Sequence, residues 1–220
     1  MIWQQLNLIV GYWPVLLKGI GMTLALSVLS LLIGVVIGFA FGILRAGPNR
    51  TLSRAVGLYV DFFRGTPFLV QVFIVFFILP EIGIELSAFA AGVVALSNLA
   101  ACFIGEIVAA GIQSVPTGQT EAAASSGFTR AQQMRLIVLP QAVRVVTPAL
   151  VGQFVLLIKD SSVVSAIGLL DLTRSGWMIV QSVPNGLLVF GIVGLGYFVI
   201  CYPLIWVSRR MERRGEAPIL

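Results

Sequence analysis

Apolar residues in this chain gather into five long runs that are separated by shorter polar segments. The runs cover about residues 23–44, 55–79, 88–112, 145–170 and 187–207. A helix rises about 1.5 Å per residue, so each run is long enough to cross the roughly 30 Å hydrocarbon core of a bilayer. Turn-forming residues flank the runs, for example at Gly47-Pro48 and Pro184-Asn185-Gly186. The pattern predicts an all-α membrane protein with about five transmembrane helices.

The composition fits a lipid environment. Of the 220 residues, 58% are hydrophobic and 10% are charged, and the mean hydropathy is +1.01. Soluble domains carry roughly 25% charged residues, so this chain has too little charge to cover a water-exposed surface. We predict one transmembrane domain over 19–210, with a cytoplasmic tail over 211–220.

The first 18 residues are expected to form an external or interfacial segment. No Lys or Arg precedes Lys18, whereas a cleavable secretory signal begins with a basic region. Trp3, Tyr12 and Trp13 suit the boundary between lipid and water, where aromatic residues are enriched. We therefore expect no cleavage of this segment.

The distribution of basic residues predicts the orientation. With five spans, eleven of the 14 Lys and Arg residues fall on one side, and Lys18, Lys159 and Arg174 fall on the other. Cytoplasmic loops accumulate Lys and Arg. We therefore expect the carboxyl terminus and the long loop over 113–144 in the cytoplasm, and the amino terminus outside. Orientation explains the net charge of +5 better than nucleic-acid binding does.

Several kinds of chemistry are excluded by residue content. The sequence has no histidine, so a His-based metal site, proton relay or catalytic base is excluded. A phosphate-binding loop requires G-x-x-x-x-G-K-[ST], but the only lysines, Lys18 and Lys159, follow Leu17 and Ile158. Cys102 and Cys201 lie in apolar runs and are interpreted as packing residues. We predict a chain that is not an enzyme and that holds no cofactor or metal of its own.

Glycines at helical spacing predict close helix packing. Gly34, Gly38 and Gly42 recur at every fourth residue of the first run and so share one helix face. This face could pack within the chain or form a seam between two subunits. The same two interpretations apply to the glycines of the last run, which are Gly191, Gly194 and Gly196.

The loop over 113–144 contains a short helical pattern. Thr117 or Thr120 could cap its start, Glu121 lies near its amino-terminal end, and Gly127 could end it. Isolated helices shorter than about 12 residues are marginal in water, so another surface must hold this one. A helix that rests on lipid headgroups would need bulky apolar residues on one face. They are missing here, which favours docking into a groove of a partner protein.

Four segments resemble a known family. Glu121-Ala-Ala123 is followed by Gly127 and then, after nine residues, by Ile137-Val-Leu-Pro140. This spacing resembles the EAA motif of ABC importer permeases. The other three segments resemble the polar amino-acid uptake family within that group: Phe63-Arg-Gly-Thr-Pro67 followed by Gln71, Gly111-Ile-Gln-Ser-Val-Pro116, and Lys159-Asp-Ser-Ser162. The resemblance covers nearly the whole chain.

The resemblance implies an ABC type I importer permease in a bacterial inner membrane. In such importers two permease subunits, identical or paralogous, form the pathway, and an external solute-binding protein delivers the amino acid. Two cytoplasmic ATPase subunits, which hold ATP and magnesium, bind the short coupling helices. The resemblance also implies that ATPase closure is transmitted through Glu121, Ala122, Ala123 and Gly127.

Ionisable residues within the fourth run are the leading candidates for substrate binding. A charged side chain at the centre of a span costs about 2.5–3.5 kcal/mol on insertion scales and is a functional hypothesis by default. An amino acid carries an ammonium and a carboxylate, and both need partners when they leave water. Asp160 could bind the ammonium, with Lys159 or Arg64 binding the carboxylate. Gln153, Ser161 and Ser162 add polar groups nearby. Alternatively, Lys159 and Asp160 only neutralise each other or reach to the outer interface.

The second run carries further polar candidates. Asp61 and Arg64 are three residues apart and could pair on one helix face. Pro67 lacks an N–H and is expected to kink the helix, with Thr66 beside it and Gln71 one turn beyond. This region could line a cavity or form a rigid joint. Glu106 in the third run is expected to be paired or protonated within the bundle and to have a structural role.

These observations favour the transmembrane subunit of an ATP-powered amino-acid importer. Two other functional hypotheses stay open. A self-sufficient secondary carrier or channel would need its own ion site and no docking helix, whereas a structural membrane anchor for a cytoplasmic enzyme would not need Lys159 and Asp160. A membrane enzyme is disfavoured because no nucleophile–base pair is evident.

Overall fold

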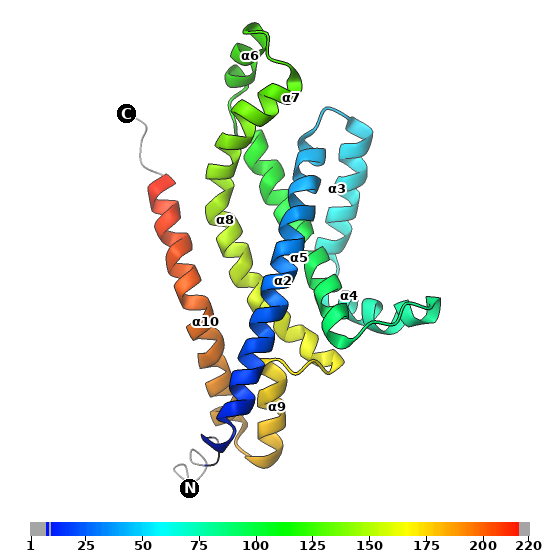
Figure 1. Ribbon diagram of the computed structural model, residues 1–220, viewed down its shortest axis with the longest axis vertical. Coiled ribbons are helices and arrows are strands. Elements are labelled where there is room, and N and C mark those ends of the chain that lie inside the picture. Colours follow the sequence, from blue (N-terminus) through cyan, green and yellow to red (C-terminus); the bar gives the residue numbers. More distant parts are fainter. Residues whose placement is uncertain (1–7, 9, 216–220) are drawn as a thin grey trace. The chain divides into compact units, whose positions relative to one another are not determined.

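The computed structural model describes residues 8 and 10–215, with side chains through residue 213, and these residues form helices and connecting turns without a β-strand. The expectation of an all-α protein is confirmed. The α-helices, shown in Figure 1, are α2 (Trp13–Ala46), α3 (Arg50–Gly65), α4 (Phe68–Phe73), α5 (Ala88–Gln113), α6 (Thr117–Ser125), α7 (Arg130–Gln132), α8 (Leu139–Asp160), α9 (Leu172–Ser182) and α10 (Gly186–Gly215).

Tighter and wider helical turns join some of these helices. Two π-helical segments, Ile74–Ile78 and Gln133–Val138, follow α4 and α7. Two 3₁₀ segments, Leu79–Ile82 and Ser161–Ile167, end the second and fourth apolar runs. The sequence pattern did not predict these local changes of pitch, because all the segments are comparably apolar.

The number of candidate membrane spans agrees with the expected five if the second apolar run, which is bent, counts as one span. Among the described residues, four helical stretches are long and apolar enough to cross a bilayer: Trp13–Ala46, Ala88–Gln113, Arg130–Ile167 and Gly186–Arg213. A fifth exists if α3 and the segment Phe68–Ile82, which meet at a sharp bend, count as one span.

The prediction of one continuous helix over 55–79 is therefore wrong, because the helix is interrupted between residues 65 and 68. Helix α3 ends at Gly65, and α4 begins only after Pro67, whose φ of −61° and ψ of 131° are extended rather than helical. Pro67 has no N–H to continue the ladder, and proline also disfavours the helical conformation at the residue before it. The expected kink is a complete break.

The pattern of apolar runs did not predict helix α9, which lies between the fourth and fifth runs. Asp171 caps this helix, because its Oδ1 accepts a hydrogen bond of 2.8 Å from the Arg174 N–H. Leu172, Gly176 and Ile179 are buried on its inner face. The sequence does contain a helix start at this place, because an acidic capping residue precedes apolar residues at helical spacing. The helix was not among the predicted spans because its eleven residues are too few to cross a bilayer.

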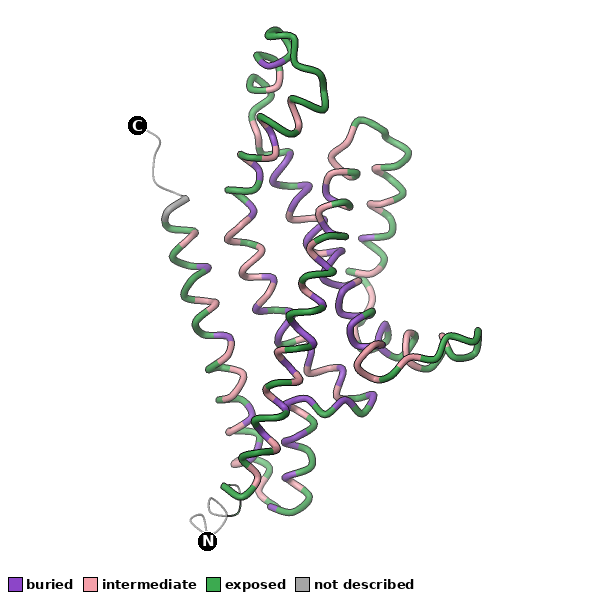
Figure 2. Tube along the Cα trace, viewed as in Figure 1, coloured by how far each residue is buried: buried purple, intermediate pink, exposed green. Residues whose placement is uncertain are grey.

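The chain divides into two compact units, and four of the helices contribute residues to both. Unit 1 contains residues 1–32, 66–97 and 154–204, and unit 2 contains 33–65, 98–153 and 205–220. Figure 2 shows buried residues along most of α5, whereas α10 is largely exposed. Because lipid replaces water around this chain, such an apolar exposed surface is expected on α10.

The apolar core of unit 1 lies where α9 packs against α2 and α10. Leu16 of α2, Leu172 and Ile179 of α9, and Val189 and Val193 of α10 form one buried cluster. A Cβ built on Gly19 would lie 2.5 Å from Ser175 Oγ and 2.9 Å from the Asp171 carbonyl oxygen. Helices α2 and α9 therefore approach so closely that only glycine fits at position 19.

Within unit 2, α2 packs on α5 through the glycine face. A Cβ on Gly38 would lie 2.7 Å from Ile104, and one on Gly42 would lie 2.5 Å from Val108. Two of the three glycines thus serve packing within the chain. In the last run Gly196 approaches Leu172, but a Cβ on Gly191 or Gly194 would meet open space.

A buried polar cluster surrounds Asp171 in unit 1. The Asp171 residue is fully buried, and its Oδ2 accepts a long hydrogen bond of 3.4 Å from the Tyr197 hydroxyl. Thr173 Oγ1 lies 3.0 Å from the same hydroxyl, and Thr23 Oγ1 accepts the Leu172 N–H at 3.1 Å. Burial raises the pKa of Asp171 from 3.8 to about 6, and the hydrogen bonds it accepts oppose that rise only in part.

Replacing Asp171 with Asn should remove a pH dependence of stability. The folded state holds the proton more tightly than the unfolded state, so stability falls as pH rises from about 4 to about 6. The full change is on the order of 2–3 kcal/mol. Asn keeps the capping oxygen but does not titrate, so the unfolding temperature of Asp171→Asn should be nearly flat over this range. Glu85→Gln, which removes an exposed carboxylate, is the control and should keep the native slope. An unchanged slope in Asp171→Asn would contradict the assignment.

Candidate functional site

The candidate residues of the fourth run lie where α8 changes into a 3₁₀ turn. Lys159 and Asp160 end α8, and Ser161 and Ser162 begin the 3₁₀ segment. Lys159 is exposed and Asp160 is half-buried, with no ion pair between the two described side chains. The Ser161 hydroxyl donates a hydrogen bond of 2.7 Å to the Ile158 carbonyl. The Ser162 hydroxyl donates one of 2.6 Å to the Lys159 carbonyl. Lys159 and Asp160 therefore form no direct ion pair in this structure.

Thr66 and Gln71 belong to the same unit as this turn. Gln71 is buried, and its Nε2 donates to Thr66 Oγ1 at 3.0 Å and to the Thr66 carbonyl at 3.2 Å. The amide therefore covers backbone that the Pro67 break leaves outside the helical ladder. Helix α4, which carries Gln71, contacts the 3₁₀ segment Ser161–Ile167. Unit 1 thus gathers six of the eight candidate substrate residues: Thr66, Gln71, Lys159, Asp160, Ser161 and Ser162.

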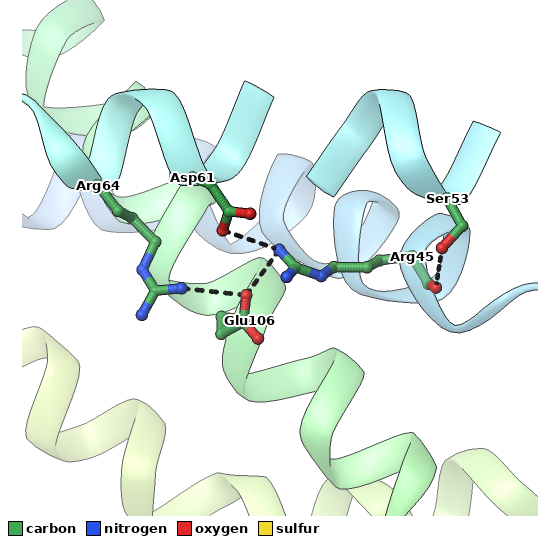
Figure 3. Close-up of polar contacts among 5 residues, drawn as sticks. All are labelled: Arg45, Ser53, Asp61, Arg64 and Glu106. Atoms are coloured by element: carbon green, nitrogen blue, oxygen red, sulfur yellow. Dashed lines mark hydrogen bonds and ion pairs between the residues drawn. The ribbon is translucent and has the colours of Figure 1, made fainter. Parts of the chain in front are cut away.

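The other two candidates, Arg64 and Gln153, belong to unit 2. Arg64 is part of an ion network there, shown in Figure 3. Its Nη1 donates to Glu106 Oε2 at 3.1 Å, and its guanidinium lies over the Phe103 ring, 5.1 Å from the centroid. Gln153 is buried on α8.

Glu106 is the centre of this network, because two arginines meet one of its oxygens. Arg45 Nη1 lies 2.7 Å from Glu106 Oε2 and 3.6 Å from Asp61 Oδ1. The Arg45 contact is an ion pair whose angles fall short of an aligned hydrogen bond. Ser53 Oγ donates to the Arg45 carbonyl at 2.6 Å, which ties the start of α3 to the end of α2. Two cations and two carboxylates make the network neutral.

The expected pairing of Glu106 is confirmed, whereas the expected pairing of Asp61 with Arg64 is wrong. Glu106 is paired, as expected, but Asp61 and Arg64 do not pair with each other, since each has its partner on another helix. The sequence pattern predicted no partner for Arg45. Its role depends on the parallel packing of α2 on α5, which places residues 45 and 106 together and cannot be read from local spacing.

Loss of the Glu106 charge should destabilise the protein more than loss of the Asp61 charge. Glu106→Gln leaves two partly buried arginines facing each other, at an expected cost of about 1–3 kcal/mol. Asp61 has a 62% exposed side chain and a single 3.6 Å contact, so Asp61→Asn should cost less than about 1 kcal/mol. Unfolding temperatures in detergent, measured side by side at one salt concentration, test the ranking. Equal losses would mean that Glu106 is not the centre of the network.

Helix α6 carries the candidate coupling residues. It ends in a turn closed by two backbone hydrogen bonds, from Gly127 N–H to the Ala124 carbonyl and from Phe128 N–H to the Ala123 carbonyl, both 3.0 Å. Gly127 has a φ of +80°, which strongly favours glycine. The expected stop at Gly127 is confirmed. Ala123 is buried, whereas Glu121 and Ala122 are exposed.

The expected start of α6 is corrected by the structure. Pro116 occupies the capping position, and no side chain caps the helix. Thr120 Oγ1 instead donates to the Thr117 carbonyl at 2.7 Å. Glu121 is the fifth residue and lies beyond the first turn, so it gains little from the positive helix end. Proline suits this boundary because the first N–H groups of a helix need no intrahelical partner.

A second cap in this loop was overlooked. Thr129 Oγ1 accepts the Gln132 N–H, and the Gln132 side chain accepts the Thr129 N–H at 2.8 Å. This is the Ser/Thr-x-x-Glu/Gln capping box, which is visible in the sequence. It starts α7, from which the π segment Gln133–Val138 leads into α8. Helix α6 contacts that π segment.

Comparison with known proteins decides the family. Residues 34–215 match the family described as binding-protein-dependent transport system inner membrane component. This chain belongs to that family. It is an ABC importer permease of the polar amino-acid type, as the resemblance in the sequence predicted. The multi-pass inner-membrane location follows from the family and the apolar helices.

Curated relatives of this permease are amino-acid transport permeases. The Bacillus subtilis arginine transport system permease protein ArtQ is 35% identical over 202 residues, covering 91% of this chain and 92% of ArtQ. The probable glutamine ABC transporter permease protein GlnM of the same organism is 37% identical over 213 residues, covering 97% and 99%. Such chains are transport subunits and not enzymes.

A solved structure supports the fold of the permease. The crystal structure of an amino acid ABC transporter with histidines matches with a TM-score of 0.86 and 35% identity, covering 94% of this chain and 96% of that one. The importer permease fold is thus shown for nearly the whole chain.

Proposed function

We propose that this permease carries a polar amino acid into the cytoplasm and that separate ATPase subunits energise it through α6. Two ATPases, holding ATP and magnesium, a second permease subunit and an extracytoplasmic solute-binding protein complete the importer. The amino terminus lies outside and the carboxyl terminus inside. The names of the relatives, which include arginine and glutamine permeases, support the substrate class.

The observation that carries this proposal is the construction of α6. Nine residues form the helix, and only Ala123 among them is buried. The closed turn at Gly127 and the contact with Gln133–Val138 fix the helix at one side, so its other side is presented outward. Small side chains there let a partner's groove approach the backbone, and Glu121 offers the one charge. A helix so short gains stability when a partner covers it.

Reversing the charge of Glu121 should uncouple transport from ATP hydrolysis. In proteoliposomes containing the assembled importer, Glu121→Lys should lower the amount of amino acid moved per ATP hydrolysed by at least about tenfold, the effect of roughly 1.4 kcal/mol at a docking contact. Glu121→Gln should have an intermediate effect. Arg130→Gln, at an exposed position in the same loop, is the control. Full coupling in Glu121→Lys would contradict the proposed contact.

Unit 1 offers the better substrate site within the chain. Asp160 is half-buried and free of ion pairs among the described side chains, so its carboxylate can receive a substrate ammonium. Lys159 is exposed and can receive the substrate carboxylate. Arg64 is already engaged by Glu106 and Phe103, which favours a positioning role over direct contact. Thr66, Gln71, Ser161 and Ser162, all in unit 1, would line this site.

Replacing Asp160 with Asn should abolish uptake without disturbing assembly. The amide keeps the shape of the side chain but cannot neutralise a substrate ammonium that has left water. The expected result is a loss of uptake of at least about 100-fold, since a lost charge-assisted partner costs roughly 3 kcal/mol. Recovery of the complete importer on purification, with Glu85→Gln as control, separates this from misfolding. Normal uptake by Asp160→Asn would end the assignment.

The same proteoliposomes distinguish the importer from a secondary carrier. An importer should show no uptake without ATP, whatever ion gradient is imposed. Uptake driven by an ion gradient alone, with ATP absent, would favour the carrier.

A further inference from the structure

The end of α10 carries a basic face that belongs to neither the proposed substrate site nor the proposed coupling helix. Trp206, Arg209, Arg210 and Arg213 line an open hollow of about 360 Å³ in unit 2. Their spacing of three, four and seven residues places them on one side of the helix. The Arg210 guanidinium lies over the Trp206 ring, 5.1 Å from its centroid. Three like charges on one helix face repel each other, so this face is stabilised when an anion is present.

No carboxylate of the described residues forms an ion pair with these arginines. Glu212 is the nearest acidic residue in sequence, but its Oε1 lies 3.2 Å from Ser208 Oγ. Ser208 is buried and also lies within hydrogen-bond distance, 3.1 Å, of the Pro148 carbonyl of α8. Glu212 is therefore drawn toward the side of α10 that meets α8, and the positive charge of the arginine face is left without a counter-ion from the chain.

The depth of this face corresponds to the lipid headgroups. Helix α10 begins at Gly186, and Trp206 follows after about 20 residues, which is the length that spans a hydrocarbon core. The apolar run ends at Val207, and Trp206 is 53% exposed. Tryptophan is enriched at the membrane interface, where its ring meets lipid and its N–H meets water. The arginines come directly after it, at the level of phosphate groups.

We propose that Arg209, Arg210 and Arg213, with Trp206, bind the headgroup of an anionic phospholipid. The planar guanidinium groups suit phosphate oxygens, because each can donate two parallel N–H···O bonds. The Trp206 ring packs beside the glycerol and the first acyl carbons. A free phosphate ion would gain nothing from this exposed apolar ring, which favours a lipid as the source of the phosphate. Clusters of basic residues just beyond a membrane span attract anionic lipids at about 1 kcal/mol per charge.

Lipid binding to the purified full chain tests the proposal. The retained lipid is counted by native mass spectrometry while dioleoyl phosphatidylglycerol or dioleoyl phosphatidylcholine is added. The wild-type chain should bind phosphatidylglycerol in preference, and Arg209→Gln with Arg213→Gln should weaken this binding about 10- to 30-fold. Arg209→Lys with Arg213→Lys keeps the charge and should lose only a few-fold. Arg50→Gln with Arg54→Gln removes the same charge from exposed positions of α3 and should bind as the wild type does.

Each other outcome would overturn the proposal. Equal binding of the two lipids, or unchanged binding by the double Gln variant, would show that no such site exists. Inorganic phosphate at millimolar concentration should not displace the lipid, and full displacement would indicate a free-anion site. Loss of co-purifying ATPase from the double Gln variant, with lipid binding intact, would assign the arginines to a protein partner.

Discussion

Backbone hydrogen bonding dominates this structure, because lipid offers no partner for a free N–H or carbonyl group. A chain that crosses a bilayer must be helical, and any interruption must be covered by its own side chains or lie against protein. The interruption at Pro67 is covered in this way, since the Gln71 amide donates to the Thr66 carbonyl. At the end of α8, Ser161 and Ser162 donate to carbonyls three residues back, where the helix tightens to a 3₁₀ turn.

These two interruptions account for the location of the candidate substrate residues. Irregular backbone is tolerated at membrane depth where it is buried or lines a polar cavity. Helix α4 contacts the 3₁₀ segment, so the two irregular places in unit 1 meet. Side chains that satisfy the backbone there are also the polar groups that a zwitterion would encounter. In unit 2, by contrast, the charged side chains where α2, α3 and α5 meet pair with one another. Arg45, Arg64, Asp61 and Glu106 form a neutral network, and such a network needs no substrate to balance its charge.

The sequence predicted features that depend on neighbouring residues better than features that depend on contacts between distant ones. Local signals worked well: apolar runs gave the spans, and Gly127 marked the end of α6. Proline at position 67 predicted a kink, but the complete break is stabilised by the Gln71 amide, which donates to Thr66 across it and cannot be predicted from the proline alone. The Arg45–Glu106 pair needed knowledge of how α2 packs on α5. Likewise, Asp171 looked like part of a connection, although its cap and its contact with Tyr197, 26 residues later, make it part of a helix junction.

A helical stretch links the candidate coupling segment to the candidate substrate residues. Helix α6 contacts Gln133–Val138, and from there the stretch Arg130–Ile167 runs through α8 to Asp160. A helix transmits displacement along its axis because its hydrogen bonds resist stretching, whereas a π segment contains one extra residue per turn and can yield locally. On the proposed function, force on α6 therefore enters α8 at its most adaptable point. It would reach the candidate substrate residues Lys159 and Asp160 at the opposite end of α8, where the 3₁₀ turn begins. Between these two irregular ends α8 contains Pro148, which has no N–H for the helical ladder, so the proposed path from the ATPase contact to Asp160 includes a third place where the helix can bend.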